Sequence, residues 1–421
     1  MFPKVKGVAD NFFDMPYWSG VIKKIESTLQ SYNFSQINIP ILEHVSLFER
    51  GLGYETDVVS KQMFVIQSKK EDIDSQTDNA ICLRPEGTAG TMRAFLENQS
   101  NVATPAKVFF YGPMFRYERP QKGRLREFHQ VNLEMIGIES ILYDAQCIKM
   151  LQTLFAQTLQ MQNIILKLNF LGETQDRQKF SQAFVADLQP KSSNLCAVCQ
   201  VRLSKNPLRI LDCKSTTCQE LFRDAPKLSS FFSEQSKQDW QLLQENLKEL
   251  SVTFTIDEKL VRGLDYYNKT VFEFASVNLG AQSAFCGGGR YDGLSEQLGS
   301  KVKIPALGCA IGMERLILIL QAQQIDMTPK PAILICIIPL STAQNKLALH
   351  LAESLITKGK TVEILLDDAK IQNKMKKANA LKATWALLIG NDEEQNNTVT
   401  IKNMITGDQQ IVAQKEVAAK I

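Results

Sequence analysis

The sequence predicts an α+β protein whose main part is an antiparallel sheet flanked by helices, followed by a smaller α/β unit. Helix-period and strand-period segments mix along residues 1–172 and again from residue 252. A Gln-, Lys- and Ser-rich stretch with a helical pattern lies between them, and after "DMTPKPA" strands and helices alternate regularly. We therefore expect these boundaries: a first part of the main domain at 1–172, a helical insertion at 173–251, a second part at 252–328, and a C-terminal domain at 329–421.

Local patterns justify each element in turn. "WSGVIKKIESTLQSYNF" has the apolar spacing of an amphipathic helix. "INIPILE", "AKVFFYGPMFRY", "EFHQVNLEMIG" and "VTFTID" are predicted strands, and "ERLILIL" is a predicted apolar helix. In the C-terminal unit, "ILICIIP", "TVEILL", "WALLIG" and "VTIKN" are predicted strands around the helix "LALHLAESLITKG".

Composition limits the class of protein. The chain has 421 residues, 44% of them hydrophobic and 22% charged, as in ordinary globular proteins. Since no apolar run approaches the roughly 18 residues that span a bilayer, and the N-terminal segment lacks an apolar signal core, we expect a cytoplasmic protein without a membrane partner. Nine cysteines, an odd number, favour reduced thiols over a disulfide framework.

Charge is uneven along the chain. The net charge is +3, and residues 330–421 carry 12 Lys and no Arg against 4 Asp and 5 Glu, which also gives 12 − 9 = +3. The Lys-rich stretch "KIQNKMKKANALK" could contact RNA phosphates, although a solvated helix face is the more common explanation for such a run.

A β-hairpin with a basic tip is predicted in "VFFYGPMFRYERPQKGRLREFHQVNLEMIG". In its second strand Val131, Leu133 and Met135 alternate with the polar residues Gln130, Asn132 and Glu134, so one face is apolar and the other polar. A solvated sheet surface would explain the polar face. The five basic residues of the tip favour a phosphate ligand instead, because the planar guanidinium fork of arginine suits phosphate oxygens.

Four further segments carry candidate site residues. In "CLRPEGTAGTMRAFL" a strand stops at Pro85, Thr88 is a predicted helix N-cap, and Glu86 could hold an amine. "FCGGGRYDGL" is interpreted as a glycine-rich turn that lets a ligand approach the backbone. In "GMERLILIL" Arg315 lies at a helix start, which indicates either an anionic ligand or an ion pair with an acid such as Glu314. The stretch "LVRGLDYYNK" places Arg262 just before the apolar strand "TVFEF".

These motifs resemble those of the class II aminoacyl-tRNA synthetases. "INIPILE" is similar to the first class motif, with Pro40 at a dimer contact; the hairpin with Arg116 is similar to the second, and "GMERL" to the third. The combination of "LRPEGT", "FRYERPQKGRLREFHQ" and "LVRGLDYYN" resembles the histidyl-tRNA synthetase family over essentially the whole chain. The resemblance implies the class II antiparallel sheet flanked by helices, with a helical insertion and a C-terminal α/β anticodon-binding domain.

The resemblance also implies a two-step ligase reaction. L-Histidine and ATP form histidyl-adenylate and pyrophosphate, and the histidyl group then passes to the 3′-terminal adenosine of tRNA(His). The implied partners are ATP, Mg²⁺ on its phosphates, L-histidine, tRNA(His) and a second copy of the chain in a homodimer. Three alternatives stay open at this point: a regulatory paralogue in histidine biosynthesis, a class II synthetase for another amino acid, and a general RNA-binding module.

Roles for individual residues follow from the resemblance. Arg262 and Arg116 are the implied catalytic residues. The implied ATP-binding residues are Arg116, Glu118, Arg124, Phe128, Arg262 and Arg315. The implied histidine-binding residues are Glu86, Gly87, Thr88, Gln130, Glu134, Tyr266, Tyr267 and Tyr291. Gln121 and Arg126, in the hairpin tip, are the implied tRNA contacts.

Four cysteines in the insertion offer a possible metal site. The run "CAVC" supplies Cys196 and Cys199, and Cys213 and Cys218 follow, which is compatible with tetrahedral zinc. The second pair is widely spaced, free buried cysteines are common, and the reaction implied by the resemblance has no need of zinc. From sequence we therefore expect no protein-bound metal and no zinc, with these four thiols left as an open question.

Overall fold

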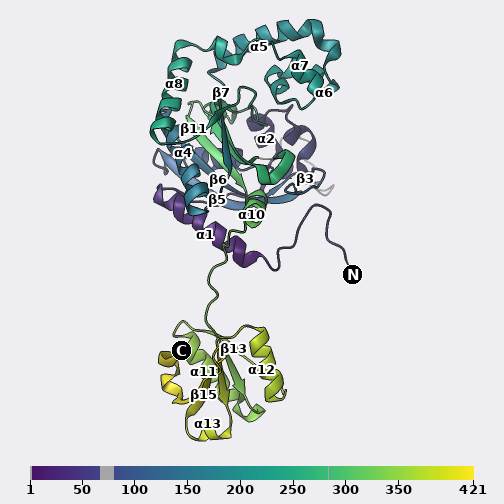
Figure 1. Cartoon of the computed structure of the whole chain (residues 1–421). Coiled ribbons are helices and arrows are strands. Elements are labelled where there is room, and N and C mark those ends of the chain that lie inside the picture. The colour runs from purple at the N-terminus through teal and green to yellow at the C-terminus, as the bar shows by residue number, and fades with distance from the viewer. Residues whose placement is uncertain (1, 67–79, 283) are drawn as a thin grey trace. The chain divides into compact units, whose positions relative to one another are not determined.

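The structure is a computed structural model in which residues 2–66, 80–282 and 284–421 are described. The chain forms two compact units, Met1–Thr328 and Pro329–Ile421 (Figure 1). Among the described residues, no helix combines the length and apolar character needed to cross a membrane.

An eight-stranded sheet organises the first unit. Its strands, in spatial order, are β1 (Ser35–Gln36), β5 (Ala106–Phe115), β6 (Glu127–Ile136), β11 (Ala306–Gly312), β10 (Ala284–Arg290), β9 (Asn268–Ser276), β7 (Ile164–Phe170) and β8 (Thr255–Ile256). Only the two edge strands, β1 and β8, run parallel to their neighbours, and every other pair is antiparallel. The predicted α+β class with an antiparallel sheet is confirmed.

Helices and a small second sheet surround this sheet. Helix α10 packs against β6, β10 and β11, and α3 packs against β6, α2 and α9. The helical elements here are α1 (Met15–Ser31), α2 (Val45–Leu52), η1 (Val58–Gln62), α3 (Thr88–Glu97), α4 (Leu142–Thr153), η3 (Leu154–Thr158), η7 (Val277–Gln282), α9 (Leu294–Gln297) and α10 (Met313–Ala322). The small sheet has the order β2 (Leu42–His44), β4 (Ile81–Leu83), β3 (Phe64–Ile66).

The β5–β6 hairpin forms as the alternating pattern predicts. Phe115 pairs with Glu127, so residues 116–126 make the tip. Leu133 and Met135 are buried in the main core, as is Val131. Asn132 and Glu134, on the opposite face of β6, are equally buried at 1% exposure. The polar face of this strand is therefore interior to the protein, and the solvated-surface interpretation is wrong for these residues.

Two local predictions differ from the structure. The glycines of "FCGGGRYDGL" lie inside strand β10 and not in a turn. A Cβ on Gly288 would lie 2.2 Å from the Gly308 carbonyl oxygen, so the close approach of β10 and β11 requires glycine. "INIPILE" is not one strand, because residues 37–41 are irregular between β1 and β2. The Arg84 guanidinium donates to the carbonyls of Ile39, at 2.8 Å, and Pro40, at 3.3 Å, in place of a sheet partner.

Between β7 and β8 the chain forms a helical segment. Its elements are α5 (Thr174–Leu188), η4 (Gln189–Asn194), α6 (Ala197–Lys205), η5 (Pro207–Asp212), α7 (Thr216–Leu221), η6 (Leu228–Phe231) and α8 (Glu234–Glu249). Buried Asp176 joins the start of α5 to the start of α8, because its carboxylate accepts from the Ser233 N–H at 2.9 Å and the Ser236 hydroxyl at 2.5 Å. Figure 1 shows α5, α6 and α7 at the end of the first unit opposite α1, and α8 along its side.

The second unit has a five-stranded mixed sheet. The order is β13 (Thr361–Ile364), β12 (Leu334–Pro339), β14 (Trp385–Ile389), β15 (Thr398–Asn403), β16 (Gln409–Ala413). Strands β13, β12 and β14 are parallel, whereas β15 and β16 are antiparallel additions. The accompanying helices are η8 (Thr342–Gln344), α11 (Asn345–Ile356), α12 (Ile371–Ala380), α13 (Asn391–Gln395), η9 (Gln414–Glu416) and α14 (Val417–Lys420).

A buried ion pair in the first unit gives a stability prediction. The fully buried Arg290 guanidinium pairs with Asp144 and donates to the Ile138 carbonyl at 2.7 Å. Arg290→Met leaves a buried carboxylate without its cation, so we expect the free energy of unfolding to fall by about 3–5 kcal/mol in urea titrations. The control Lys167→Met breaks a more exposed pair with Asp257 and should cost at most about 1 kcal/mol. Equal losses in the two variants would contradict this account.

Candidate active site

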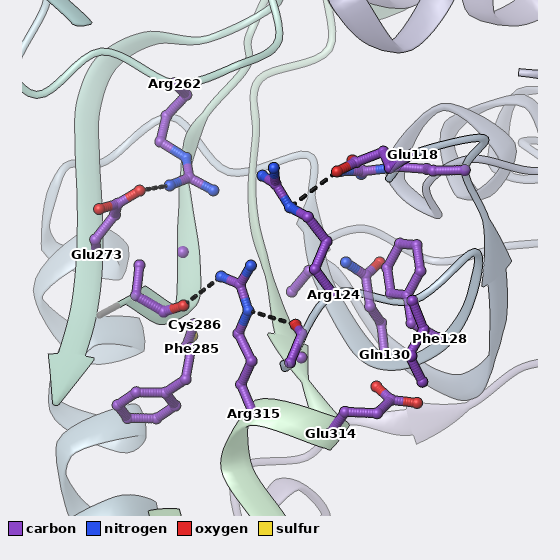
Figure 2. A pocket seen from close by; sticks show the side chains of 17 residues that line it. Glu118, Arg124, Phe128, Gln130, Arg262, Glu273, Phe285, Cys286, Glu314 and Arg315 are labelled. Atoms are coloured by element: carbon purple, nitrogen blue, oxygen red, sulfur yellow. Dashed lines mark hydrogen bonds and ion pairs between the residues drawn. The ribbon is translucent and has the colours of Figure 1, made fainter. Parts of the chain in front are cut away.

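A cavity of about 220 Å³ opens over one face of the large sheet (Figure 2). Residues of the β5–β6 hairpin, β9, β10, β11 and the start of α10 line it, together with Arg262 from the loop before β9. We call it the arginine cavity; its charged lining residues are Arg116, Glu118, Arg124, Arg262, Glu273, Glu314 and Arg315.

Four guanidinium groups approach this one space. Figure 2 shows those of Arg124, Arg262 and Arg315 pointing toward one another from different elements. The Arg315 group is oriented by the Gly123 carbonyl, at 3.0 Å, and the Ala284 carbonyl, at 2.6 Å. Like charges so close together repel, and an anion between them would offset that repulsion.

The carboxylates of the cavity are each engaged. Glu118 accepts from Arg124 at 2.8 Å, and Glu273 pairs with Arg262. Glu314 accepts from the His129 backbone N–H at 2.9 Å, and its carboxylate lies 3.0 Å from the His129 ring Nδ1. His129 of β6 holds the Glu314 carboxylate. The packing of the start of α10 against β6 therefore fixes the position of Glu314.

Arg116 has a different environment. Its Nε donates to the Pro85 carbonyl at 2.9 Å, and its guanidinium lies 5.3 Å from the centre of the Phe128 ring. Burial lowers the pKa of this guanidinium, although nearby Glu118 and Glu86 act against that effect. Within the described part of the chain no carboxylate forms an ion pair with Arg116. A desolvated cation of this kind favours an anionic ligand.

Arg262 is held between two strands of the sheet. Its side chain and that of Glu273 are 22% and 24% exposed. Burial lowers the pKa of Arg262, but the Glu273 carboxylate, together with the nearby Tyr267, Tyr266 and Cys286, more than offsets this, so the net shift is upward and the group stays charged. A Cβ on Gly287 would lie 2.6 Å from an Arg262 terminal nitrogen, so glycine in β10 makes room for the guanidinium.

A second group of polar residues is buried beside this cavity. We call it the acid–tyrosine cluster; its members are Glu86, Thr88, Glu134, Tyr266, Tyr267 and Tyr291, all buried. Tyr266 lies in van der Waals range of both other rings, with centroid distances of 4.5 Å to Tyr267 and 5.5 Å to Tyr291. Strand β6 joins the two regions, because Gln130 lines the cavity and Glu134 belongs to the cluster on the same face.

The Glu134 carboxylate is at the centre of this cluster. It accepts a 2.7 Å hydrogen bond from the Thr88 hydroxyl and another from the Tyr291 hydroxyl. Burial raises its pKa to about 8 despite these donors. A Cβ on Gly308 would lie 1.5 Å from Glu134 Oε2, so only glycine at this point of β11 leaves room for the carboxylate.

Glu86 has a role that the sequence did not predict. Its carboxylate accepts from the backbone N–H groups of Thr88 and Ala89, both at 2.8 Å, and so caps helix α3. The predicted N-cap, Thr88, is instead the first residue of α3. The prediction was wrong because a carboxylate two residues upstream takes the free N–H groups, which releases the Thr88 hydroxyl for Glu134.

Most of the candidate site residues lie in one of these two regions. The arginine cavity contains Arg116, Glu118, Arg124, Phe128, Gln130, Arg262 and Arg315. The acid–tyrosine cluster contains the other candidates for histidine binding, with Gly87 packed against Phe110. Gln121 and Arg126 line neither region; Gln121 is exposed, and Arg126 lies 4.1 Å over the Tyr117 ring.

Sequence reasoning missed several residues of the site. Glu273 is the partner of Arg262, and its signal was a lone acid within the apolar strand "TVFEF". Asn132 is buried between Gln130 and Glu134, and its Nδ2 has no hydrogen-bond partner among the described residues. The Gln130 Oε1 and Arg262 Nε atoms are likewise buried without partners there. Such unsatisfied polar atoms in one place are typical of a ligand-binding site.

Comparisons with known proteins agree with each other. Residues 17–316 match the family described as histidyl-tRNA synthetase, and residues 334–421 match the anticodon binding domain. A histidine–tRNA ligase of Thermodesulfovibrio yellowstonii is 38% identical over 407 residues, covering 96% of this chain and 94% of that protein. One of Bacillus licheniformis is 37% identical over 399 residues, covering 94% and 92%. The crystal structure of apo S. aureus histidyl-tRNA synthetase has a TM-score of 0.83 at 29% identity, covering 100% of this chain and 99% of that one.

The pKa of Glu134 generates a pH prediction. Since its pKa rises from 4.5 to about 8 on folding, the folded chain keeps a proton that the unfolded chain has released between these pH values. The stabilisation from this carboxyl is therefore full below pH 4.5, declines between pH 4.5 and about 8, and is lost once the pH has risen through 8. We expect wild type to lose stability relative to Glu134→Gln over this window, by up to about 1.4 kcal/mol per pH unit in urea titrations.

The control for this prediction is Glu249→Gln, which changes an exposed acid at the end of α8. Its stability difference from wild type should stay flat over the same pH range. A difference between wild type and Glu134→Gln that is flat, or that grows in favour of wild type as the pH rises, would contradict the proposed burial of a protonated carboxyl.

Proposed function

This chain belongs to the histidyl-tRNA synthetase family, and on that premise we propose how its residues carry out histidine–tRNA ligation. The reaction has two steps. The carboxylate of L-histidine attacks the α-phosphorus of ATP and gives histidyl-adenylate and pyrophosphate. The histidyl group then passes to the 3′-terminal adenosine of the tRNA. The chain has the fold of a class II synthetase.

We propose that Arg116 and Arg262 stabilise the first transition state. Negative charge grows on the α-phosphate oxygens while a carboxylate approaches in line, so fixed cations lower the barrier. Arg262 is fixed by Glu273, and Arg116 by the Pro85 carbonyl, so both charges stand in place before the substrates arrive. The observation that carries this proposal is the convergence of four guanidiniums on one cavity beside a buried acid–tyrosine cluster.

The rest of ATP would occupy the remainder of the arginine cavity. We propose that Phe128 stacks on the adenine and that Glu118 accepts from its exocyclic amine. Glu118 lies on the same side of the cavity as Phe128 and pairs with Arg124 (Figure 2). Arg124 would then be free to turn toward a phosphate, and Arg315 would hold the terminal phosphates.

Mg²⁺ is the metal that we propose with ATP. Three carboxylates line the cavity, and each already pairs with an arginine or with His129. This donor set suits an ion held mainly by phosphate oxygens and water, and Glu118, Glu273 and Glu314 are the carboxylates that could assist. When bound, the ion would neutralise phosphate charge.

The acid–tyrosine cluster is the proposed histidine pocket. Glu134, with Tyr267 and Tyr291, would hold the imidazole, and Glu86, Thr88 and Gln130 would hold the α-amino group beside Tyr266. An imidazole N–H can replace the Thr88 or Tyr291 hydroxyl as the donor to Glu134. A ligand without that N–H would set an apolar group against the buried polar side chain of Glu134, which is the kind of mismatch that gives discrimination of roughly 10⁴–10⁵.

For the tRNA we propose two contact regions. The hairpin tip, with Gln121 and Arg126, would approach the acceptor end. Residues 329–421 would read the anticodon, and helix α12 offers the exposed Lys370 beside its start and Lys376 within it for RNA phosphates. Lys374 is not available for this, since it is buried and donates to the Pro339 carbonyl at 2.8 Å.

We also propose an oligomeric state, a division into domains and a cellular location for this chain. We propose a homodimer, because the family resemblance places the segment around Pro40 at a dimer contact. The helical segment of residues 173–251 is proposed as an insertion into a catalytic domain formed by 1–172 and 252–328. The nine cysteines are all free, which is typical of a reducing compartment such as the cytoplasm.

Replacing Arg262 tests the adenylation proposal. Arg262→Ala should lower the rate of histidine-dependent ATP–pyrophosphate exchange by about 10²–10³-fold, because a fixed donor to the developing phosphate charge is lost. The double variant Arg262→Ala/Glu273→Gln separates catalysis from structure, since it also removes the carboxylate that the single variant leaves unpaired.

If the double variant stays slow, the loss comes from the missing cation, as proposed. If it regains wild-type exchange, Arg262 serves only to neutralise Glu273 and the proposal is wrong. Arg119→Ala is the matched control, because Arg119 is an exposed arginine of the hairpin tip that does not line the cavity; its exchange rate should match wild type.

A further inference from the structure

Four cysteine thiols converge in the helical segment between β7 and β8. Cys196 precedes α6, Cys199 lies in its first turn, Cys213 follows η5, and Cys218 lies in α7. Their Sγ atoms all lie within 4.8 Å of one another, although the residues span 23 positions from 196 to 218. The sequence shows the pairs Cys196/Cys199 and Cys213/Cys218, but only the fold brings the two pairs together.

The distances fit a single tetrahedral ion. A zinc ion with Zn–S bonds of about 2.3 Å places its ligand sulfurs about 3.8 Å apart. The Cys196 and Cys213 sulfurs are 3.9 Å apart. A disulfide needs sulfurs about 2.05 Å apart, and all four cysteines are free.

Backbone N–H groups also point at these sulfurs. The Cys196 N–H donates to Cys218 Sγ at 3.2 Å, and the Ser215 N–H donates to Cys213 Sγ at 3.5 Å. Such donors stabilise the negative charge that a thiolate carries when it binds a metal, and they orient the ligand. Ser215 is the N-cap of α7, so the turn that presents Cys213 also starts the helix that carries Cys218.

Another close pair of thiols shows that two neighbouring sulfurs alone do not indicate a metal site. Cys286 and Cys309, on neighbouring strands β10 and β11, also have sulfurs 3.9 Å apart. That pair is explained by sheet register, since Cys309 lies opposite Gly288 and Cys286 opposite Ile311. A short S···S distance is therefore not diagnostic by itself, whereas four sulfurs around one point form a complete ligand set.

We propose that Cys196, Cys199, Cys213 and Cys218 bind one Zn²⁺ ion as a closed, structural tetrathiolate site. Zinc is preferred because four soft thiolates in tetrahedral arrangement suit it, and a closed site leaves no position for a substrate. Three of the four cysteines are buried and Cys196 is half-buried. Bound zinc would link the start of α6, the end of η5 and α7, which are short elements with little core of their own.

The zinc site would also act at a distance on the arginine cavity. Between the two cysteine pairs, Asn206 Nδ2 donates to the Asp265 carboxylate at 3.0 Å, and Arg209 Nε does so at 3.1 Å. Arg209 also donates to the Gly263 carbonyl at 2.6 Å. Asp265 and Gly263 belong to the loop that carries Arg262, so zinc would fix the segment that holds this loop. Only this consequence rests on the proposed role of Arg262; zinc binding does not.

Metal analysis of the full chain tests the site directly. Protein purified without chelators should contain about one zinc per chain, and Cys199→Ser and Cys213→Ser should each lose it. Cys336→Ser is the matched control, because Cys336 is equally buried but lies in β12 of the second unit; it should keep the zinc. Wild type without stoichiometric zinc, or with iron in its place, overturns the proposal.

A second measurement does not depend on the variants folding. Wild type stripped of metal and refilled with Co²⁺ should show thiolate-to-metal charge-transfer absorption and intense tetrahedral ligand-field bands. The stripped chain should also exchange its amide hydrogens faster at residues 196–218 and 260–266, through the contacts of Arg209. A cobalt spectrum without thiolate bands would rule out the tetrathiolate, whatever the variants do.

Discussion

The structure depends on keeping positive charge inside a cavity that is partly shielded from water. Arg116 enters it from the β5–β6 hairpin and Arg262 from the loop before β9, and the protein offsets their charge only in part, with Glu273 on Arg262 and a neutral carbonyl on Arg116. If carboxylates neutralised both arginines fully, the cavity would no longer attract a phosphate. If no carboxylate neutralised them, burying the two cations would cost the fold too much free energy. We propose that this half-compensated state serves adenylate formation, because the charge is already in place when the transition state forms.

Strand β6 joins this cavity to the acid–tyrosine cluster, which is the proposed histidine pocket. Its polar face presents Gln130 to the cavity and Glu134 to the acid–tyrosine cluster, four residues apart on a rigid element. Glycine on the neighbouring elements makes room: Gly308 for Glu134, and Gly287 for Arg262. A ligand that contacts both ends of this strand is therefore held at two points whose spacing the sheet fixes.

The sequence predicted those features that depend on local patterns. The amphipathic α1, the β5–β6 hairpin and the α+β class follow from periodicity, and the family resemblance named Arg262 and Glu134. One failure is local, the cap of α3, and the others depend on contacts between residues far apart in the sequence. Glu86 displaced Thr88 as the cap of α3, the triple glycine served strand approach and not a turn, and Arg84 took the carbonyls that a strand at residues 37–41 would have used. The Asp265–Arg209 contact and the four converging thiols also depend on segments meeting in space.

The central claim is that Arg262 and Arg116 contact the reacting phosphate while Glu134 contacts the imidazole. A crystal structure of the full chain with a histidyl-sulfamoyl-adenosine analogue, whose sulfamoyl group stands in for the phosphate, tests it most directly. The account predicts both guanidiniums within hydrogen-bonding distance of the sulfamoyl or carbonyl oxygens, and an imidazole nitrogen on the Glu134 carboxylate. An analogue bound with its sulfamoyl group remote from Arg262, or with its imidazole outside the cluster of Glu134 and Tyr291, would contradict it.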